Sequence, residues 1–147
     1  MTYFADLAPN TYFGRWQDVL VSVGWLDAVH EPRRGGVSEE FFRALVLLLV
    51  EPWQPVVFAG HGVCERCRFS GGPSKLVFEG NTIMLGSNNL FVPADDHRVF
   101  VAPSLIAHYI DAHEYAPPDE FQRAVVACPR TSIEHRRKLL ERGIRLQ

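Results

Sequence analysis

Two cysteines separated by two residues, Cys64 and Cys67, constrain this chain more than any other feature of its sequence. They lie in the stretch Gly-His-Gly-Val-Cys-Glu-Arg-Cys over 60–67, where His61 precedes the first cysteine by three residues. A tight turn with this spacing directs both sulfur atoms to one point, which suits a tetrahedral ion such as Zn²⁺. The sequence therefore predicts a small domain held together by a metal ion.

Two thiolates supply half of a tetrahedral site, so the remaining ligands must come from elsewhere in the chain. His108 and His113 lie in and at the end of a predicted helix. Five residues turn a regular helix through about 500°, so the two rings diverge by about 140° unless the helix loosens over 112–114. We expect both histidines to reach the metal and complete a Cys₂His₂ set, with His61 as the alternative ligand.

Two other interpretations of the cysteine pair, a redox pair and a catalytic zinc site, fit the sequence less well. A thioredoxin-type redox pair opens a helix after a strand, whereas the chain here runs into a loop at Ser70–Pro73. Nucleobase deaminases pair His-x-Glu with Pro-Cys-x-x-Cys, but Val63 precedes the first cysteine and His30 is followed directly by Glu31. The third cysteine, Cys128, follows an apolar helical face, so we expect a buried side chain and not a ligand.

Composition narrows the class of protein. The 147 residues suit a single domain over 1–147, and 47% hydrophobic with 22% charged residues is ordinary globular usage. Three cysteines, an odd number, argue against a disulfide framework. The chain opens without an apolar signal segment, and its longest apolar run, Ala44–Val50, is too short to span a membrane. These features predict a cytoplasmic protein with reduced thiols.

Charge is distributed unevenly along the chain. Residues 130–147 hold six basic and two acidic side chains, a net charge of +4, which leaves −6 for the remainder. The usual interpretation of such a segment is a solvated helix face, and the alternative is a contact surface for an acidic partner or nucleic acid. Because this helix has few apolar positions, we expect it to bury little area and to be dispensable for the core.

The hydrophobic pattern predicts an α+β fold with a small antiparallel sheet, arranged as a meander, and three or four helices. The cysteine turn would form a zinc-knuckle or treble-clef-like element against one helix. Residues 1–15 are expected to be an irregular aromatic arm. The predicted strands cover 19–26, 56–58, 75–79, 82–85, 90–92 and 98–101. The predicted helices begin at Ser38 (ending before Pro52), at Pro103 (running to His113), near Pro118 and after Thr131.

Several segments together resemble a family of short, uncharacterised bacterial proteins. They are the opening Met-Thr-Tyr-Phe-Ala-Asp-Leu-Ala-Pro-Asn-Thr-Tyr-Phe, Val-Gly-Trp-Leu-Asp over 23–27, the cysteine turn, and the stretches 102–115 and 117–121. The resemblance covers the chain to about Pro129. It implies that the His-x-x-Cys-x-x-Cys turn and the helix with His-Tyr-Ile-x-x-His belong to one unit, and it brings no known activity.

The function that these observations favour is a non-enzymatic, zinc-stabilised domain that acts through protein contacts, as an accessory or immunity-like protein. One alternative is a small zinc enzyme with an open metal position. Another is a metal-free binding module whose basic tail contacts an acidic partner. Ligand count separates the first two, because four protein ligands close a zinc site and three leave a position for water or substrate.

Overall fold

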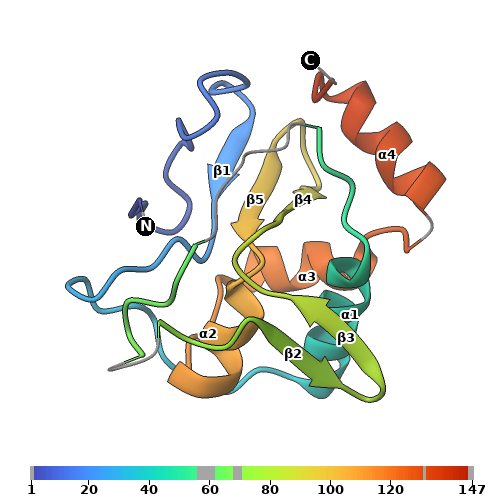
Figure 1. Cartoon of the computed structure of the whole chain (residues 1–147). Coiled ribbons are helices and arrows are strands. Elements are labelled where there is room, and N and C mark those ends of the chain that lie inside the picture. The colour runs from blue at the N-terminus through green and yellow to red at the C-terminus, as the bar shows by residue number, and fades with distance from the viewer. Residues whose placement is uncertain (1, 56–61, 68–70, 131, 146–147) are drawn as a thin grey trace.

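The α+β class predicted from the sequence is present in the computed structural model, which describes residues 2–55, 62–67, 71–130 and 132–145 (Figure 1). The strands are β1 (Leu20–Ser22), β2 (Lys75–Phe78), β3 (Asn81–Met84), β4 (Asn89–Pro93) and β5 (Val99–Pro103). The helices are α1 (Glu39–Val50), α2 (Ile106–His113), α3 (Asp119–Ala127) and α4 (Ser132–Glu141). The strand expected at 56–58 lies outside the described residues.

The strands form two small sheets and not one meander. β2 and β3 make a separate antiparallel hairpin, and β4 pairs antiparallel with β5. β1 joins the other edge of β5 in parallel, with Leu20 opposite Val99. Each strand is locally visible in the sequence, but a parallel pairing between segments so far apart leaves no local signal.

The position of α1 agrees with the helix predicted from local features of the sequence. The Ser38 hydroxyl accepts a hydrogen bond from the Phe41 amide at 3.1 Å, and Glu39 and Glu40 lie in the first turn, where the helix dipole favours negative charge. The apolar side of the helix packs against α3, α2 and β3. α2, by contrast, begins later than predicted, because Pro103 is the last residue of β5.

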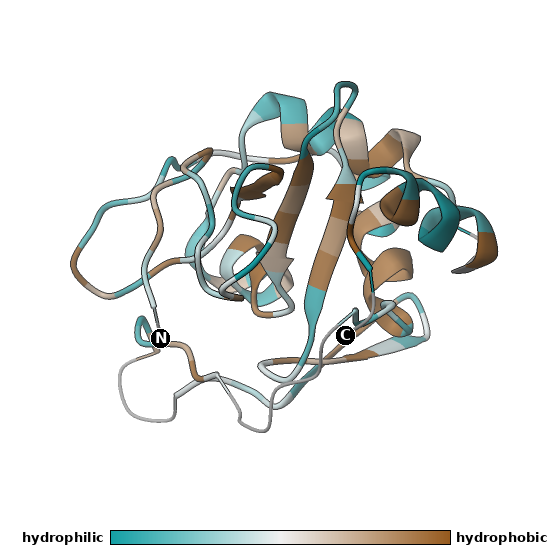
Figure 2. Ribbon diagram, turned by 90° about the horizontal axis from the view of Figure 1, so that it is seen from above, coloured by the Kyte–Doolittle hydropathy of each residue, from teal (hydrophilic) through white to brown (hydrophobic). Residues whose placement is uncertain are grey.

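Two hydrophobic clusters cover opposite faces of the three-stranded sheet, so β4 and β5 are apolar on both sides (Figure 2). Along β5, Phe100 and Ala102 belong to the main cluster with α1, α2 and α3, whereas Val99 and Val101 belong to the second. This alternation is the two-residue period of a strand. The second cluster is closed by Trp25, by aromatic side chains of the segment before β1, and by α4.

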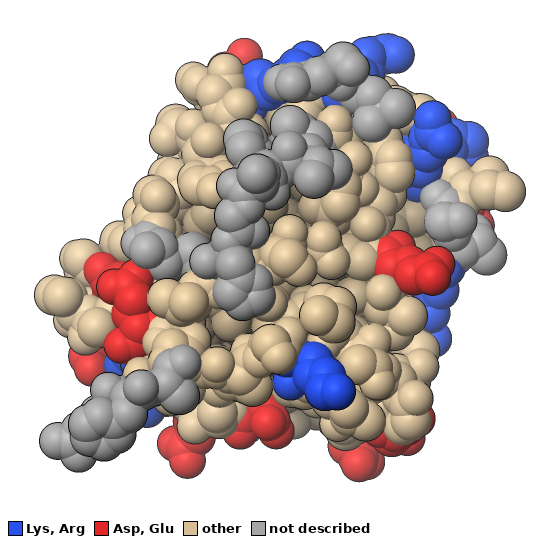
Figure 3. Space-filling model, viewed as in Figure 1, with Lys and Arg blue, Asp and Glu red and all other residues tan. Residues whose placement is uncertain are grey.

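The expectation that the C-terminal helix buries little area is wrong. Leu139 and Ile144 are fully buried in the second cluster, and the His135 ring lies 2.6 Å from the Phe91 carbonyl oxygen. A left-handed turn at Gly143 (φ +90°) returns the chain so that Ile144 reaches the core. The basic side chains of α4 nevertheless gather on the outer surface (Figure 3).

No helix in the described part of the chain is long and apolar enough to cross a membrane.

We predict that Leu139→Ala lowers the free energy of unfolding by about 2–5 kcal/mol, because it leaves a cavity in a closed core. The matched control is Ile133→Ala on the same helix, where the side chain is 83% exposed; its effect should stay within about 0.5 kcal/mol. Urea unfolding followed by circular dichroism measures both. Equal losses in the two variants would contradict the packing of α4 described above.

We also predict a pH dependence from His135. Burial lowers the pKa of this histidine in the folded state, so the unfolded chain binds a proton more readily. The stability that the neutral ring contributes is therefore complete above about pH 6.5 and is lost as the pH falls below that value. Between pH 7.5 and 5.5, the wild-type protein should lose more unfolding free energy than His135→Gln. Unfolding free energies that change equally with pH in the two proteins would contradict this prediction.

Candidate metal centre

The cysteine turn is fixed by backbone hydrogen bonds. The Cys67 amide donates to the Cys64 carbonyl at 3.3 Å, which closes the turn, and the Cys64 amide donates to the Gly71 carbonyl at 2.6 Å. The Gly62 amide donates to the Gly86 carbonyl at 2.7 Å. The turn is thus anchored to two neighbouring loops, and both sulfur atoms are held on one side of it.

Gly71 and Gly72 allow the chain to pass close to this turn. Both have left-handed backbone angles, φ +70° and +89°, which side-chain-bearing residues rarely adopt. A Cβ atom on Gly72 would lie 2.9 Å from the Cβ of Cys64 and 3.5 Å from Nε2 of His108. The glycine pair thus provides the space for close packing at the cysteines.

α2 ends directly after the second of its two histidines. The Glu114 amide bonds the Tyr109 carbonyl, five residues back instead of the four of a regular α-helix. Glu114 itself has a left-handed conformation at φ +57°. The helix thus ends directly after His113, and the Tyr115 amide also donates to the Tyr109 carbonyl, at 3.2 Å. The rings of His108 and His113 lie with their centroids 5.0 Å apart and nearly perpendicular.

Four of the five residues predicted as ligands converge. The Sγ atom of Cys67 lies 3.1 Å from Nε2 of His108 and 3.5 Å from Nε2 of His113. The Sγ atom of Cys64 is also 3.5 Å from Nε2 of His113. One ligand atom from each of the four lies within 4.8 Å of all the others, a group that could hold a metal ion. His61, the fifth, lies outside the described residues.

Burial sets the protonation of these groups. It raises the pKa of the Cys64 thiol and, with the neighbouring His113, lowers the pKa of His108. The pKa of His113 is lowered first by burial and then by the positive charges of Arg66 and Arg34. Both imidazoles therefore favour the neutral form, which is the form that binds a metal. A buried thiol loses its proton only against a compensating positive charge, such as a metal ion supplies.

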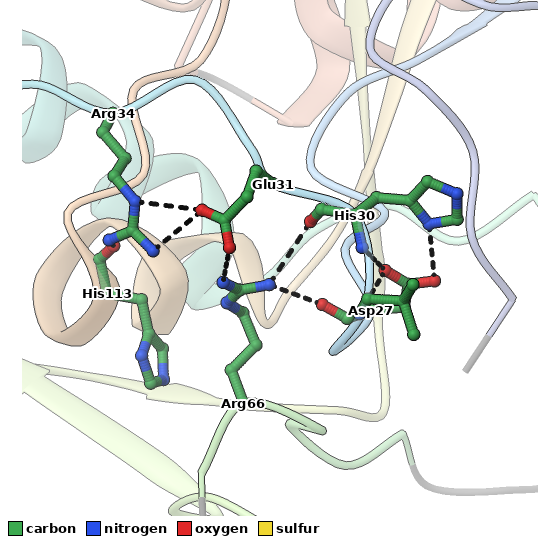
Figure 4. A network of polar contacts seen from close by, with 7 residues as sticks. Asp27, His30, Glu31, Arg34, Arg66 and His113 are labelled. Atoms are coloured by element: carbon green, nitrogen blue, oxygen red, sulfur yellow. Dashed lines mark hydrogen bonds and ion pairs between the residues drawn. The ribbon is translucent and has the colours of Figure 1, made fainter.

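Arg66, inside the Cys-x-x-Cys turn, ties the site to the segment after β1 (Figure 4). Its guanidinium donates to the Asp27 carbonyl at 2.7 Å and to the His30 carbonyl at 3.4 Å, and it lies 3.6 Å from the Glu31 carboxylate. Arg34 continues this network, since it pairs with Glu31 and donates to the backbone carbonyl of His113 at 3.4 Å. The cysteine turn and the end of α2 thus share one polar scaffold.

Sequence reasoning misses these supporting residues. The pattern over 32–36, which includes Arg34, indicates only a turn, and Arg66 stands in the sequence as a spacer between the cysteines. The signal in the sequence that could have pointed to Arg66 is an arginine lying between two candidate metal ligands.

Tyr109 belongs to the apolar face of α2 by its spacing, but its buried hydroxyl has no hydrogen-bond partner among the described residues. Burial and the nearby Cys64 raise the pKa of this phenol, which therefore stays protonated.

Cys128 lies apart from this group, as expected. Its side chain is buried in the main hydrophobic cluster, and burial raises the pKa of its thiol to about 12.

We predict that Gly72→Ala destabilises the protein and disturbs the cysteine turn, because its new methyl group would overlap the Cys64 side chain. Gly80→Ala is the matched control, since Gly80 has a similar left-handed angle (φ +80°) and a methyl group there would meet no atom within 4 Å. Both variants incur backbone strain of about 1–3 kcal/mol. Only Gly72→Ala should lose more unfolding free energy than this in chemical denaturation. The rate at which Cys64 and Cys67 react with a thiol reagent should also change only in that variant. Identical behaviour of the two variants would contradict the close approach.

The chain matches a family model described as "Domain of unknown function (DUF7919)" over residues 2–126. Comparisons with curated proteins and with solved structures gave no match. All four residues of the cluster lie within the matched range, whereas α4 lies beyond it. The expected membership of an uncharacterised family is thereby confirmed, and the chain belongs to the DUF7919 family.

Proposed function

We propose that this protein binds one zinc ion through Cys64, Cys67, His108 and His113, and that the ion stabilises its fold. The observation that carries the proposal is the spacing of the ligand atoms. A tetrahedral zinc ion with bonds of about 2.3 Å to sulfur and 2.0–2.1 Å to nitrogen places neighbouring sulfur and nitrogen ligands about 3.5 Å apart. Three of the four sulfur–nitrogen distances at this site are 3.1, 3.5 and 3.5 Å, and the fourth is within 4.8 Å.

The donor set favours zinc over other common cations. Two thiolates with two imidazoles form a nitrogen and sulfur set that suits tetrahedral zinc, whereas magnesium and calcium select oxygen ligands. The cysteines also lie in a turn outside any described helix, unlike a redox pair at the start of a helix. Reduced cysteines that hold zinc agree with a cytoplasmic location.

Four protein ligands support a structural role. A catalytic zinc site keeps a position for water or substrate, and a fourth protein ligand occupies that position. Cys64 and His108 are also buried, so solvent has little access to this side of the site. We therefore favour a non-enzymatic domain that acts through contacts with a protein partner. Apolar side chains left exposed near the turn and on the hairpin, Val63, Val77 and Met84, are available for such contacts.

The ion would connect the cysteine turn and the end of α2, which are far apart in the chain. The ligand pairs are 41, 46 and 49 residues apart in the chain. Metal binding to such a set is coupled to folding, because the site does not exist in the unfolded chain. At a free zinc concentration a thousandfold above the dissociation constant, binding stabilises the folded state by about 4 kcal/mol.

We predict one equivalent of zinc per chain in protein purified without chelator, measured by elemental analysis. Cys64→Ser and His113→Asn should each lose most of the zinc and unfold at lower temperature, because three ligands hold the ion far less tightly than four. Cys128→Ala is the matched control and should keep a full equivalent, since Cys128 lies in the hydrophobic core. Zinc loss in Cys128→Ala equal to that in Cys64→Ser would refute the ligand assignment.

Cobalt substitution separates a closed site from an open one. The Co²⁺ protein should show the intense visible absorption of a tetrahedral site, and added imidazole should leave that spectrum unchanged. A spectrum that shifts in a saturable manner with imidazole would indicate an exchangeable ligand and would favour a zinc enzyme.

A further inference from the structure

A cavity of about 450 Å³ lies between α3, α4 and the turn that joins β4 to β5. Its volume is within the range of small-molecule binding sites, about 300–1,000 Å³. None of the four residues of the candidate metal centre lines it. The cavity is therefore separate from that centre, and its use would be independent of the zinc site.

Part of the cavity wall is apolar. Phe100 of β5, Ala94 after β4 and Cys128 after α3 are all buried and line it. Because burial raises the pKa of the Cys128 thiol to about 12, that side chain is uncharged at neutral pH. This part of the wall suits the hydrocarbon body of a ligand.

Three cationic side chains also line the cavity, and none of them forms an ion pair among the residues that the structure describes. Arg123 on α3 and Lys138 on α4 form no hydrogen bond or ion pair within the part of the chain that the structure describes. Arg142 donates to the carbonyls of Ala94 at 2.6 Å and Arg98 at 3.1 Å. These bonds fix its guanidinium in place, and neutral carbonyls leave its full charge uncompensated.

The acidic groups of the lining only partly balance this charge. Asp95 and Glu120 also face the cavity, which leaves its lining with one net positive charge. Glu120 also lies 3.6 Å from the guanidinium of Arg98, a cation outside the lining that pairs with Asp96 at 2.9 Å as well. An anionic ligand would therefore meet a positive potential at an apolar wall.

We propose that this cavity binds a small organic anion, a carboxylate with a compact aromatic or aliphatic body. The carboxylate pairs with Arg123 and Lys138, and the apolar body packs against Phe100. Charge-assisted hydrogen bonds to arginine and lysine fix the orientation, and burial of the hydrocarbon part supplies the remaining affinity.

Titrations of the full-length protein, as purified without chelator, test this proposal, with phenylacetate as the probe and amide chemical shifts as the measurement. Phenylacetate should cause saturable shifts in α3, α4 and the β4–β5 turn. The neutral analogue phenylacetamide should bind at least tenfold more weakly, and so should inorganic phosphate, which has no apolar body. Equal binding of either analogue would overturn the proposed ligand class, and the absence of saturable shifts would overturn the site.

Variants assign the binding to the two cations. Arg123→Gln and Lys138→Gln should each weaken phenylacetate binding about tenfold without altering the thermal unfolding temperature, since neither side chain makes a described bond. Arg137→Gln is the matched control, because Arg137 lies beside Lys138 on α4, pairs with Glu134 and Glu141, and does not line the cavity. Affinity that falls equally in Arg137→Gln would indicate attraction to the basic helix as a whole and would overturn the proposal.

Discussion

The four metal-ligand candidates meet where α2 ends, beside the hydrogen bond from the Glu114 amide to the Tyr109 carbonyl. A regular helix would direct its two histidines about 140° apart. Both rings nevertheless reach the sulfur atoms, and the left-handed backbone of Glu114 ends the helix directly after His113. The centre therefore depends as much on how α2 terminates as on which residues it contains.

The same end of α2 carries the supports of the site. The backbone carbonyl of His113 accepts a hydrogen bond from Arg34, and Arg34 shares the Glu31 carboxylate with Arg66 of the cysteine turn. Hydrogen bonds and ion pairs thus join three segments without a metal ion. These are the stretch after β1, the cysteine turn and the end of α2. Most of these ion pairs are exposed and individually weak. Arg66, whose side chain is only 12% exposed, is the member most able to hold the turn in position.

What the sequence could predict was local, and what it could not predict was long-range. Ser38, the acidic residues after it and Pro52 placed α1 within a residue or two, because capping acts over one helical turn. The spacing of Cys64 and Cys67 identified the turn in the same way. The parallel pairing of Leu20 with Val99, by contrast, depends on the whole fold. The burial of Leu139 could not be predicted, because three apolar side chains on a basic helix suggest little buried area, and the sequence does not show that this helix covers the second face of the sheet.

The separation of the ligands along the chain has a consequence for biosynthesis. The ribosome adds about 5–20 residues per second, and His113 follows Cys64 by 49 residues. Both thiols therefore leave the ribosome several seconds before His113, the last of the four ligand candidates. β5, the strand that β1 requires, emerges before His113 as well. The sheet can thus assemble before the fourth ligand candidate emerges, whereas α3 and α4 follow later. A metal ion bound at this stage would end the exposure of two oxidisable sulfur atoms before the two hydrophobic clusters are complete.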